Sequence, residues 1–497
     1  MINFNEILSL TPEIIIVFFA FIIIIIDLIL GKKVRPSDIA SIGIASSLIF
    51  TILMYSNIIK FEDNFSSPYS SVISIDKYSM LFKIVILLLS LSISTVGKEL
   101  LSKSIKLRSE FWGLFMISLS GMMMLTSSSE MITAWVALEL TSLPLIGMLS
   151  LNKKSHSLEI SFKYLILSAT SSAIILMGIS QLYGLSGSTL FSEIIPLGNS
   201  LNGRFLFEDS SQLLLIFSVI LIISGFSFKI ASFPFFTWVP DVYQGSPSLV
   251  TLYLSVVSKI AGFSILIRFL FESVNIDVFS NITLFIALIS CASMFYGNIM
   301  AIRQNNLKRL FAYSTIAHAG YILIGVASLQ LNGNDGSFSG INSTIFYLIS
   351  YGITNLTAFL SMISLSRYVN SYDINDFKGL GSFQKYQSLI FSISLISLLG
   401  IPATVGFMGK AFIFSGAISN DYFWLASFGI INSLISAYYY MRIVKVLFVD
   451  KNENNFSEIK FPRLKFITSI GAILIITLGL APFALLSIVE SALNTIL

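Results

Sequence analysis

A set of ionisable side chains lies inside long apolar runs of this sequence, where a charge needs a specific reason to persist. The set comprises Lys83, Glu139, Lys163, Lys229, Lys259, Arg268, His318 and Lys410. A charge at the centre of a membrane costs about 2.5–3.5 kcal/mol on insertion scales, so such residues face a partner or a water-filled path. Lysine, glutamate and histidine can release a proton in a protein, whereas arginine cannot. These residue types therefore indicate a buried path for ions, and most simply for protons.

Two of the lysines lie beside signals for an interrupted helix. Lys229 stands five residues before Pro234 in GFSFKIASFPFF, and Lys410 stands eight residues after Pro402 in LLGIPATVGFMGKAF. Proline removes a backbone hydrogen bond, and inside a membrane the freed carbonyl groups must face protein or water. We therefore expect a wet cavity beside each lysine. A simple kink around a locally neutralised lysine is the alternative at Lys229.

Three further residues lie near the middle of their apolar runs. Glu139, in TAWVALELTSLPL, has no cation within one helical turn, so its partner must come from another helix. It is a candidate for transport because a carboxylate inside a membrane is a functional hypothesis by default. Lys259 lies in LSVVSKIAGF, and His318 lies in AYSTIAHAGY. Histidine changes charge near neutral pH and suits a proton relay; a hydrogen-bonded core histidine is the alternative reading of His318.

The remaining cations lie nearer the ends of their runs. Lys163, toward the cytoplasmic end, either extends to the lipid headgroups or modulates Glu139 from the neighbouring helix. Lys83 and Arg268 lie near the outer ends of their runs. We expect their long side chains to reach the headgroups there.

The composition requires a membrane as the solvent. Of 497 residues, 55% are hydrophobic and only 11% are charged, against about 25% charged residues in soluble domains. The net charge of +4 is too small to indicate nucleic-acid binding. The single cysteine, Cys291, excludes a disulfide framework and a cysteine-based metal or iron–sulfur site, and two histidines are too few for a histidine metal cluster. We therefore expect no cofactor in this chain.

Fourteen apolar runs are long enough to cross a bilayer. Their ranges are 12–30, 38–57, 78–96, 111–127, 130–150, 160–183, 211–239, 248–271, 281–301, 308–329, 340–366, 388–418, 423–441 and 466–490. If both termini lie outside, the cytoplasmic loops hold 21 Lys and Arg residues and the outer loops hold 3, as the positive-inside rule requires. No basic residue precedes the first run, so we expect it to remain in the mature protein rather than act as a signal peptide.

The two interrupted helices are the seventh and twelfth spans, five apart. This spacing divides the chain into a three-span segment (1–110), two five-span repeats (111–272 and 281–449) and a C-terminal loop with the last span (450–497). An odd number of spans inverts the second repeat, and interrupted helices at matching positions point to the ion site of a transporter. The predicted fold is an all-α membrane protein of fourteen transmembrane helices with two inverted five-helix repeats, each containing a discontinuous helix.

Three motifs carry a resemblance to a known family. FKIASFPFFTWVPDVYQGSP, LKRLFAYSTIAHAGY and GIPATVGFMGK resemble the proton-pumping antiporter-like subunits of respiratory complex I, and the resemblance covers all fourteen spans. The chain length, the lack of a long lateral helix after the last span, and lysine at position 410 are similar to the N-type subunits. M-type and cation-antiporter subunits usually carry glutamate at that position.

The resemblance implies roles for the matching positions. Glu139 and Lys229 would form the Glu–Lys pair of the first half-channel, and Lys259 would be the central connecting lysine. His318 would lie on the link toward Lys410, the proton-exchanging residue of the second half-channel.

Two positions depart from the family pattern. Phe236 stands where histidine is usual, which leaves no polar side chain at that position. Ala403 stands where a second proline is common, which makes the break near Pro402 less rigid.

The resemblance also implies a function, namely proton translocation coupled to quinone reduction in an NADH–quinone oxidoreductase. Partner subunits would hold the NAD, FMN, iron–sulfur clusters and quinone, and the partners would be other membrane subunits, including related antiporter-like ones, within the lipid bilayer. The expected location is the bacterial plasma membrane, with an organelle inner membrane or a thylakoid as the alternative.

Other functions stay open at this point. The chain could belong to a multisubunit cation/proton antiporter, which glutamate at position 410 would have favoured. It could belong to a ferredoxin- or deazaflavin-dependent quinone-reducing complex. A stand-alone metabolite carrier or a passive scaffold would not need a line of lysines in mid-membrane.

Overall fold

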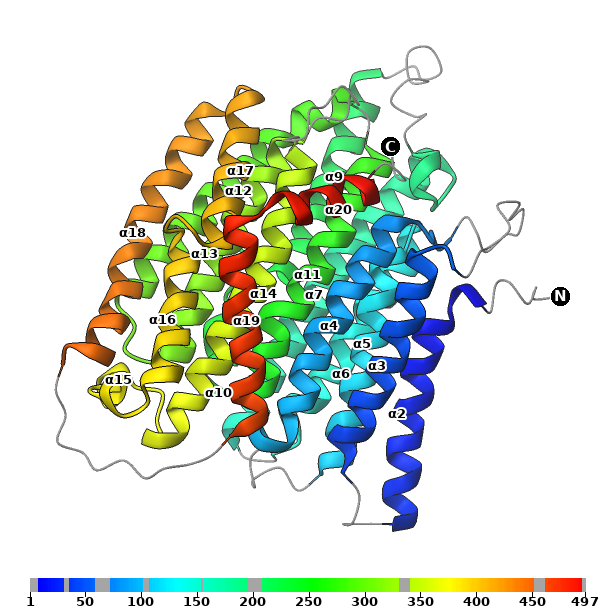
Figure 1. Ribbon diagram of the computed structural model, residues 1–497. Coiled ribbons are helices and arrows are strands. Elements are labelled where there is room, and N and C mark those ends of the chain that lie inside the picture. Colours follow the sequence, from blue (N-terminus) through cyan, green and yellow to red (C-terminus); the bar gives the residue numbers. More distant parts are fainter. Residues whose placement is uncertain are drawn as a thin grey trace.

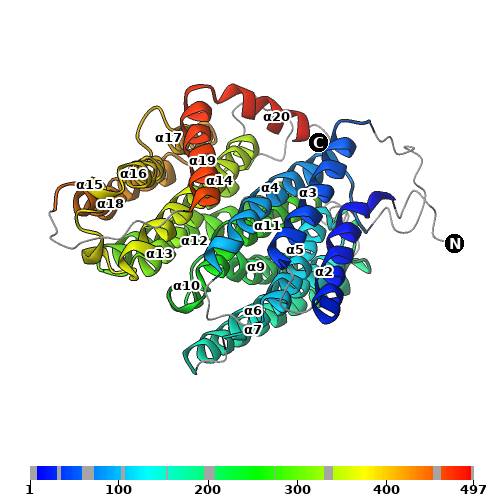
Figure 2. The ribbon, with the colours of Figure 1, turned by 60° about the horizontal axis from the view of Figure 1, so that its bottom comes forward.

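Long helices lie side by side in one elongated bundle (Figures 1 and 2). The computed structural model describes residues 8–30, 35–58, 72–101, 107–152, 155–194, 208–274, 276–329, 340–450 and 461–493. Within these ranges the regular structure is helical, apart from three isolated β-bridges in loops. A helix satisfies its own backbone hydrogen bonds, which a chain surrounded by lipid must do.

Within the described ranges, eleven helices are long and apolar enough to cross a membrane. They are α2 (Thr11–Leu30), α3 (Pro36–Tyr55), α4 (Lys77–Leu100), α6 (Met131–Ser150), α7 (Ser155–Ser186), α9 (Glu208–Ile230), α11 (Ser248–Ser273), α12 (Ile276–Ile302), α13 (Leu307–Ala327), α14 (Gly340–Val369) and α19 (Pro462–Leu480). The other elements are α5 (Arg108–Ser127), η2 (Phe191–Glu193), α10 (Trp238–Gly245), η3 (Ile374–Phe377), α15 (Leu380–Phe383), α16 (Lys385–Leu399), α17 (Val405–Ser419), α18 (Phe423–Phe448) and α20 (Phe483–Leu493). The prediction of an all-helical, multi-pass membrane protein is confirmed.

Burial separates the central helices from those that face outward. The apolar windows of α11 and α13 are 100% buried and that of α14 is 94% buried, whereas those of α2, α7 and α19 are 28%, 33% and 33% buried. Large apolar side chains such as Phe18 and Leu28 of α2 are exposed, as expected of a surface that lipid covers. Polar residues on α11, α13 and α14 are therefore held inside protein and not against lipid.

Both predicted helix breaks are present. α9 ends at Ile230 and α10 begins at Trp238, with Pro234 in the intervening segment. α16 ends at Leu399 and α17 begins at Val405, with Pro402 between them. Proline disfavours helical geometry in the residue before it and blocks the preceding turn, so each helix ends upstream of its proline.

Two predicted boundaries are wrong. The predicted spans 211–239 and 248–271 leave 240–247 as a connecting loop, but Trp238–Gly245 forms the short helix α10. The range 466–490 was expected to be one span, but α19 ends at Leu480 and α20 begins at Phe483 and runs across the bundle (Figure 1). Pro482 lies at this junction and cannot continue the helical hydrogen bonds.

Candidate functional site

Lys229 lies in the last turn of α9 and is 5% exposed. Its Nζ donates hydrogen bonds to the hydroxyl groups of Thr141 and Ser142 on α6, the latter at 3.3 Å. Glu139 lies on the same helix, one turn or less from both acceptors, and is half-buried. The described residues include no ion pair within 4.0 Å between Glu139 and Lys229, so the lysine is held by neutral groups.

A small cavity nevertheless brings Glu139 and Lys229 together. It has a volume of about 20 Å³, and its polar lining consists of these two residues and serines of α6 and α7: Ser142, Ser168, Ser171 and Ser172. A space of about 10–15 Å³ is enough for one water molecule when two to four polar partners surround it. The cavity can therefore hold a water between the carboxylate and the ammonium group, and it fits the expectation of a wet site beside Lys229.

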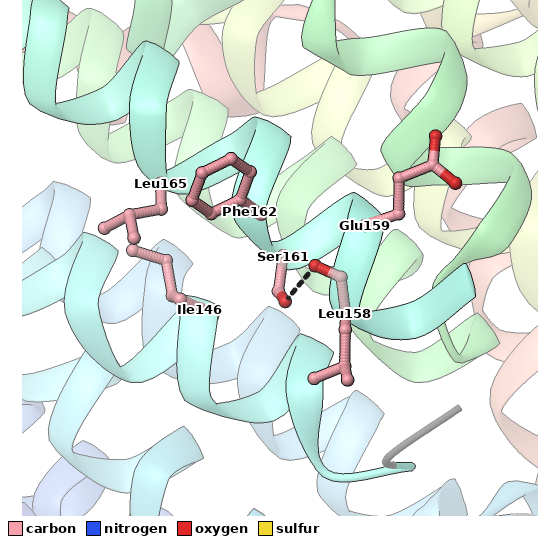
Figure 3. Close-up of a pocket in the computed structure, with 6 residues that line it drawn as sticks. All are labelled: Ile146, Leu158, Glu159, Ser161, Phe162 and Leu165. Carbon is pink, nitrogen blue, oxygen red and sulfur yellow. Dashed lines mark hydrogen bonds between the residues drawn. The ribbon is translucent and has the colours of Figure 1, made fainter. Parts of the chain in front are cut away.

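Glu139 also reaches an outward groove between α6 and α7. This groove of about 250 Å³ is lined by Glu139 and mostly apolar residues, including Leu143, Ile146 and Leu165. Ile146 and Leu165 also line a second hollow of about 450 Å³ further along the same helices. Figure 3 shows the apolar side chains of this second hollow, with the Glu159 carboxylate directed away from Ile146. The larger hollow is apolar and contains none of the buried lysines.

Lys259 lies at the centre of α11 and is 1% exposed. Its Nζ donates a hydrogen bond to the backbone carbonyl of Thr315 on α13 and lies 5.5 Å from the ring centroid of Tyr351. The Tyr351 hydroxyl donates to Thr315 Oγ1 at 3.3 Å. In the described part of the chain no carboxylate lies within 4.0 Å of this ammonium group.

His318 lies in a group of tyrosine side chains. Its Nδ1 hydrogen-bonds to the Tyr347 hydroxyl at 2.7 Å, and its Nε2 hydrogen-bonds to the Tyr440 hydroxyl at 3.2 Å. The imidazole ring lies 5.2 Å from the Tyr351 ring, which also contacts Lys259. Both ring nitrogens thus have partners that can donate or accept a proton. The arrangement is compatible with a relay and with a hydrogen-bonded core histidine.

Lys410 lies against the second helix break and is 5% exposed. Its Nζ donates to the carbonyl of Leu399 and to the hydroxyl of Ser433, both at 2.9 Å, and lies 4.6 Å from the Tyr321 ring centroid. Leu399 is the last residue of α16, where carbonyl groups lack a partner within the helix. Gly400 adopts a left-handed conformation with φ of 89° next to this contact. The break therefore provides the acceptor that the buried lysine needs.

Lys163 lies in a different place from the one expected for a modulator of Glu139. Its Nζ forms ion pairs with Glu159 at 2.8 Å and with Asp241 at 3.2 Å, and its side chain is 44% exposed. Asp241, on α10, also pairs with Arg309 at 2.9 Å. Lys163 thus joins α7 to α10 at the surface of the bundle.

The expectation that Lys83 and Arg268 reach the headgroups is wrong. Lys83 is 3% exposed and pairs with Glu13 of α2 at 2.6 Å. Arg268 is fully buried and pairs with Asp76 and Glu272, each at 2.8 Å. Each cation faces a carboxylate inside the protein. The partner of Lys83 lies on another helix, α2. Asp76, one partner of Arg268, lies at the N-terminus of α4.

Several uncharged residues at the site were not identified from the sequence. They are Thr141, Ser142, Thr315, Tyr347, Tyr351, Ser433 and Tyr440. Hydroxyl-bearing residues are frequent throughout these helices, so their types carry no signal of their own. Only their position opposite a buried lysine or histidine distinguishes them.

Three buried lysines and His318 lie on neighbouring helices. Lys229, Lys259, His318 and Lys410 lie on α9, α11, α13 and α17, and each consecutive pair of these helices is in contact. Among the described residues, no group of three or more His, Cys, Asp or Glu side chains could hold a metal ion. A multi-pass bundle with protonatable groups on successive contacting helices is the arrangement expected of an antiporter-like membrane protein.

Comparison with known proteins identifies the family. Residues 128–436 match the family described as NADH:quinone oxidoreductase/Mrp antiporter, transmembrane. The NADH-quinone oxidoreductase subunit N of Dehalococcoides mccartyi is 33% identical over 98% of this chain and 99% of that protein. The subunit N of Pelagibacter ubique is 36% identical over 99% of each chain. The chain belongs to this family, in the group of NADH-quinone oxidoreductase subunit N proteins.

A solved structure shares the fold over almost the whole chain. A chain of respiratory complex I from Thermus thermophilus with bound aureothin has 26% sequence identity and a TM-score of 0.78, covering 97% of this chain and 100% of that chain.

Proposed function

We propose that this chain is the N-type proton-translocating membrane subunit of a complex I-like NADH–quinone oxidoreductase. The observation that carries the proposal is the line of buried, protonatable groups on the adjacent helices α9, α11, α13 and α17. Among the described residues, no carboxylate lies within 4.0 Å of the ammonium groups of Lys229, Lys259 and Lys410. A lysine without a counter-charge gives up its proton more readily than an ion-paired lysine does.

Glu139 controls how firmly Lys229 holds its proton. Two unit charges 4 Å apart interact by about 4 kcal/mol at an effective dielectric of 20. A change in the distance between Glu139 and Lys229 across their shared cavity therefore changes how firmly the lysine holds its proton. When the carboxylate moves away, Lys229 releases its proton and the next lysine experiences less repulsion.

His318 and its tyrosines join the central lysine to the last one. Tyr351 contacts both Lys259 and the His318 ring, and Tyr321 contacts both His318 and Lys410. Lys410 then exchanges protons at the second helix break. Electron transfer takes place in partner subunits, which hold NAD, FMN, iron–sulfur clusters and quinone.

The proposal includes the number of membrane spans and their division into repeats. We propose fourteen transmembrane spans, with a three-span segment (1–110), two inverted five-span repeats (111–272 and 281–449) and a C-terminal part (450–497). The breaks between α9 and α10 and between α16 and α17, each beside a buried lysine, support matching positions in the two repeats.

Coupled transport by the assembled complex in liposomes tests the proposal. Electron flow and proton uptake are measured together for the wild type and for Lys259→Met. We expect Lys259→Met to lower the ratio of protons to electrons, because it removes the titratable group between the two breaks. An assembled Lys259→Met complex with an unchanged ratio would refute proton transfer through this line.

A cation/proton antiporter subunit is the second candidate, since the matched family also includes Mrp antiporters. Lysine at position 410 argues against sodium transfer, because an ammonium group offers no oxygen ligand to a cation. Proton uptake that depends on sodium in the liposome assay would favour the antiporter.

The relatives described above are bacterial, which favours the plasma membrane as the location of this chain. Their names favour NADH over ferredoxin or a deazaflavin as the electron donor.

A further inference from the structure

A polar cavity lies where α4 and α14 end and α10 passes to α11. It has a volume of about 290 Å³, and it lies at the end of the bundle where the sequence predicts cytoplasmic loops. Two cations, Lys308 and Arg367, line it together with hydroxyl and amide side chains that include Ser248, Ser371 and Tyr372. No carboxylate belongs to its described lining. The cavity contains none of the residues assigned to proton transfer.

Lys308 is the buried charge of this cavity, at 5% exposure. Its Nζ donates to the carbonyl of Ser246 at 2.9 Å and lies 4.5 Å from the ring centroid of Tyr372. An ammonium group has three hydrogen-bond donors, and the described residues supply one acceptor. A buried charge is costly unless a counter-charge or several hydrogen bonds compensate it. Lys308 therefore has unused donors in a space that can hold a ligand.

Arg367 adds a second positive charge that is also not neutralised. It is half-buried, its Nη2 donates to the carbonyl of Leu100 at 2.6 Å, and its charge repels that of Lys308. Asp373 follows the lining residue Tyr372 but its side chain is exposed, and two other nearby carboxylates are engaged elsewhere. Glu99 accepts hydrogen bonds from the backbone of Arg463 and Leu464, and Asp241 pairs with Lys163 and Arg309. The described chain thus supplies two cations to one cavity and no anion.

The size and chemistry of the cavity define its ligand. A space of about 10–15 Å³ is enough for one water molecule, so this cavity has room for a group of several heavy atoms. An arginine fork and an ammonium group together suit the oxygens of a phosphate. Basic pockets between membrane helices on the cytoplasmic side bind anionic headgroups. We propose that this cavity binds a phosphate-bearing anion, either the headgroup of an anionic lipid or free inorganic phosphate.

Protection of a single cysteine tests the proposal in the assembled complex. Ser371, which lines the cavity, is replaced in the variant Ser371→Cys, with Cys291→Ala to remove the native thiol. The complex is placed in phosphatidylcholine nanodiscs, and the rate at which an uncharged methanethiosulfonate modifies position 371 of this chain is measured, so that the charge of the membrane surface does not itself change the rate. One arm adds inorganic phosphate at constant ionic strength; the other replaces part of the phosphatidylcholine by phosphatidylglycerol without phosphate.

We expect one arm to slow modification, and the arm that does so identifies the source of the anion. Lys308→Gln and Arg367→Gln should each weaken the protection roughly tenfold, the size of one charge-assisted hydrogen bond. Lys385→Gln, a matched control at the exposed start of α16, should leave it unchanged. If Lys308→Gln fails to assemble, the half-buried Arg367→Gln decides the question. Absence of protection in both arms, or full protection in Arg367→Gln, would overturn the proposal.

Discussion

Lys410 of α17 donates a 2.9 Å hydrogen bond to the carbonyl of Leu399, the residue at which α16 ends. The helix break and the buried lysine thus form one unit, because the break frees the acceptor that the lysine uses. A group that must lose and regain a proton is better served by such neutral acceptors than by a carboxylate that would hold the charge permanently.

Removal or fixation of the charge at position 410 should stop proton transfer. We expect Lys410→Ala to lose most of this chain's share of pumping. Lys410→Arg should also lose it, because arginine keeps its proton in a protein. Proton uptake and electron flow in liposomes measure both variants. Full pumping by an assembled Lys410→Arg complex would show that Lys410 need not titrate.

Gly400→Ala should disturb the same contact from the backbone side. Gly400 has φ of 89°, and an added Cβ would lie 3.1 Å from Cδ of Lys410. A left-handed conformation costs a residue with a Cβ about 1–2 kcal/mol, so the thermal transition of the complex should fall and pumping should decrease. The control is Gly184→Ala in α7, where an added Cβ meets no atom within 4 Å. A variant Gly400→Ala as stable and active as Gly184→Ala would contradict the close approach.

Glu139→Gln should strongly reduce coupled proton transport, because the neutral amide cannot control the charge of Lys229 across their shared cavity. Glu139→Asp should be milder, since it retains the carboxylate. Glu490→Gln, which neutralises a half-buried carboxylate on α20, serves as the control for the loss of one negative charge. A normal ratio of protons to electrons in an assembled Glu139→Gln complex would exclude this role.

Asp76→Asn should destabilise the protein without a direct effect on the relay. Arg268 is fully buried, and Asp76 accepts two of its hydrogen bonds, each at 2.8 Å. Loss of one partner costs about 3–5 kcal/mol when it leaves a buried charge unpaired, and since Arg268 keeps its pair with Glu272, we expect a loss of about 3 kcal/mol. Asp38→Asn removes a surface pair with Arg463, whose side chains are 33% and 43% exposed, and should cost about 0–1 kcal/mol. Thermal unfolding measures the loss of stability in both variants. Equal losses would show that the buried Arg268–Asp76 pair contributes no more than the surface pair.

Cysteine labelling from each side of the membrane should follow the distribution of positive charge. Ser155 is exposed at the start of α7, and we expect Ser155→Cys to react from the cytoplasmic side only. Arg204→Cys, at a position outside the described residues, should react from the outer side only. Reaction of Ser155→Cys exclusively from outside would invert the predicted topology.

The sequence alone was sufficient to identify the membrane class, the three buried lysines Lys229, Lys259 and Lys410, and the helix breaks. Apolar runs indicate the lipid environment directly, because a segment that crosses the bilayer must be predominantly apolar along its whole length. Pro234 and Pro402 report the breaks because the missing backbone donor is a local property of the chain. The resemblance of three motifs gave the family, which the comparisons confirmed.

Only the tertiary structure decided which groups the charges meet. The sequence offers Lys163 as a modulator of Glu139 or as a headgroup contact, whereas in the structure it pairs with Asp241, 78 residues further along the chain. Arg268 was expected at the headgroups but meets Asp76, 192 residues away. The break near Pro402 was predicted, yet the contact of Lys410 with the Leu399 carbonyl depends on how α17 is placed against the end of α16. Hydropathy is a property of single segments, whereas the partner of a buried charge depends on which helices pack together and on how each is rotated.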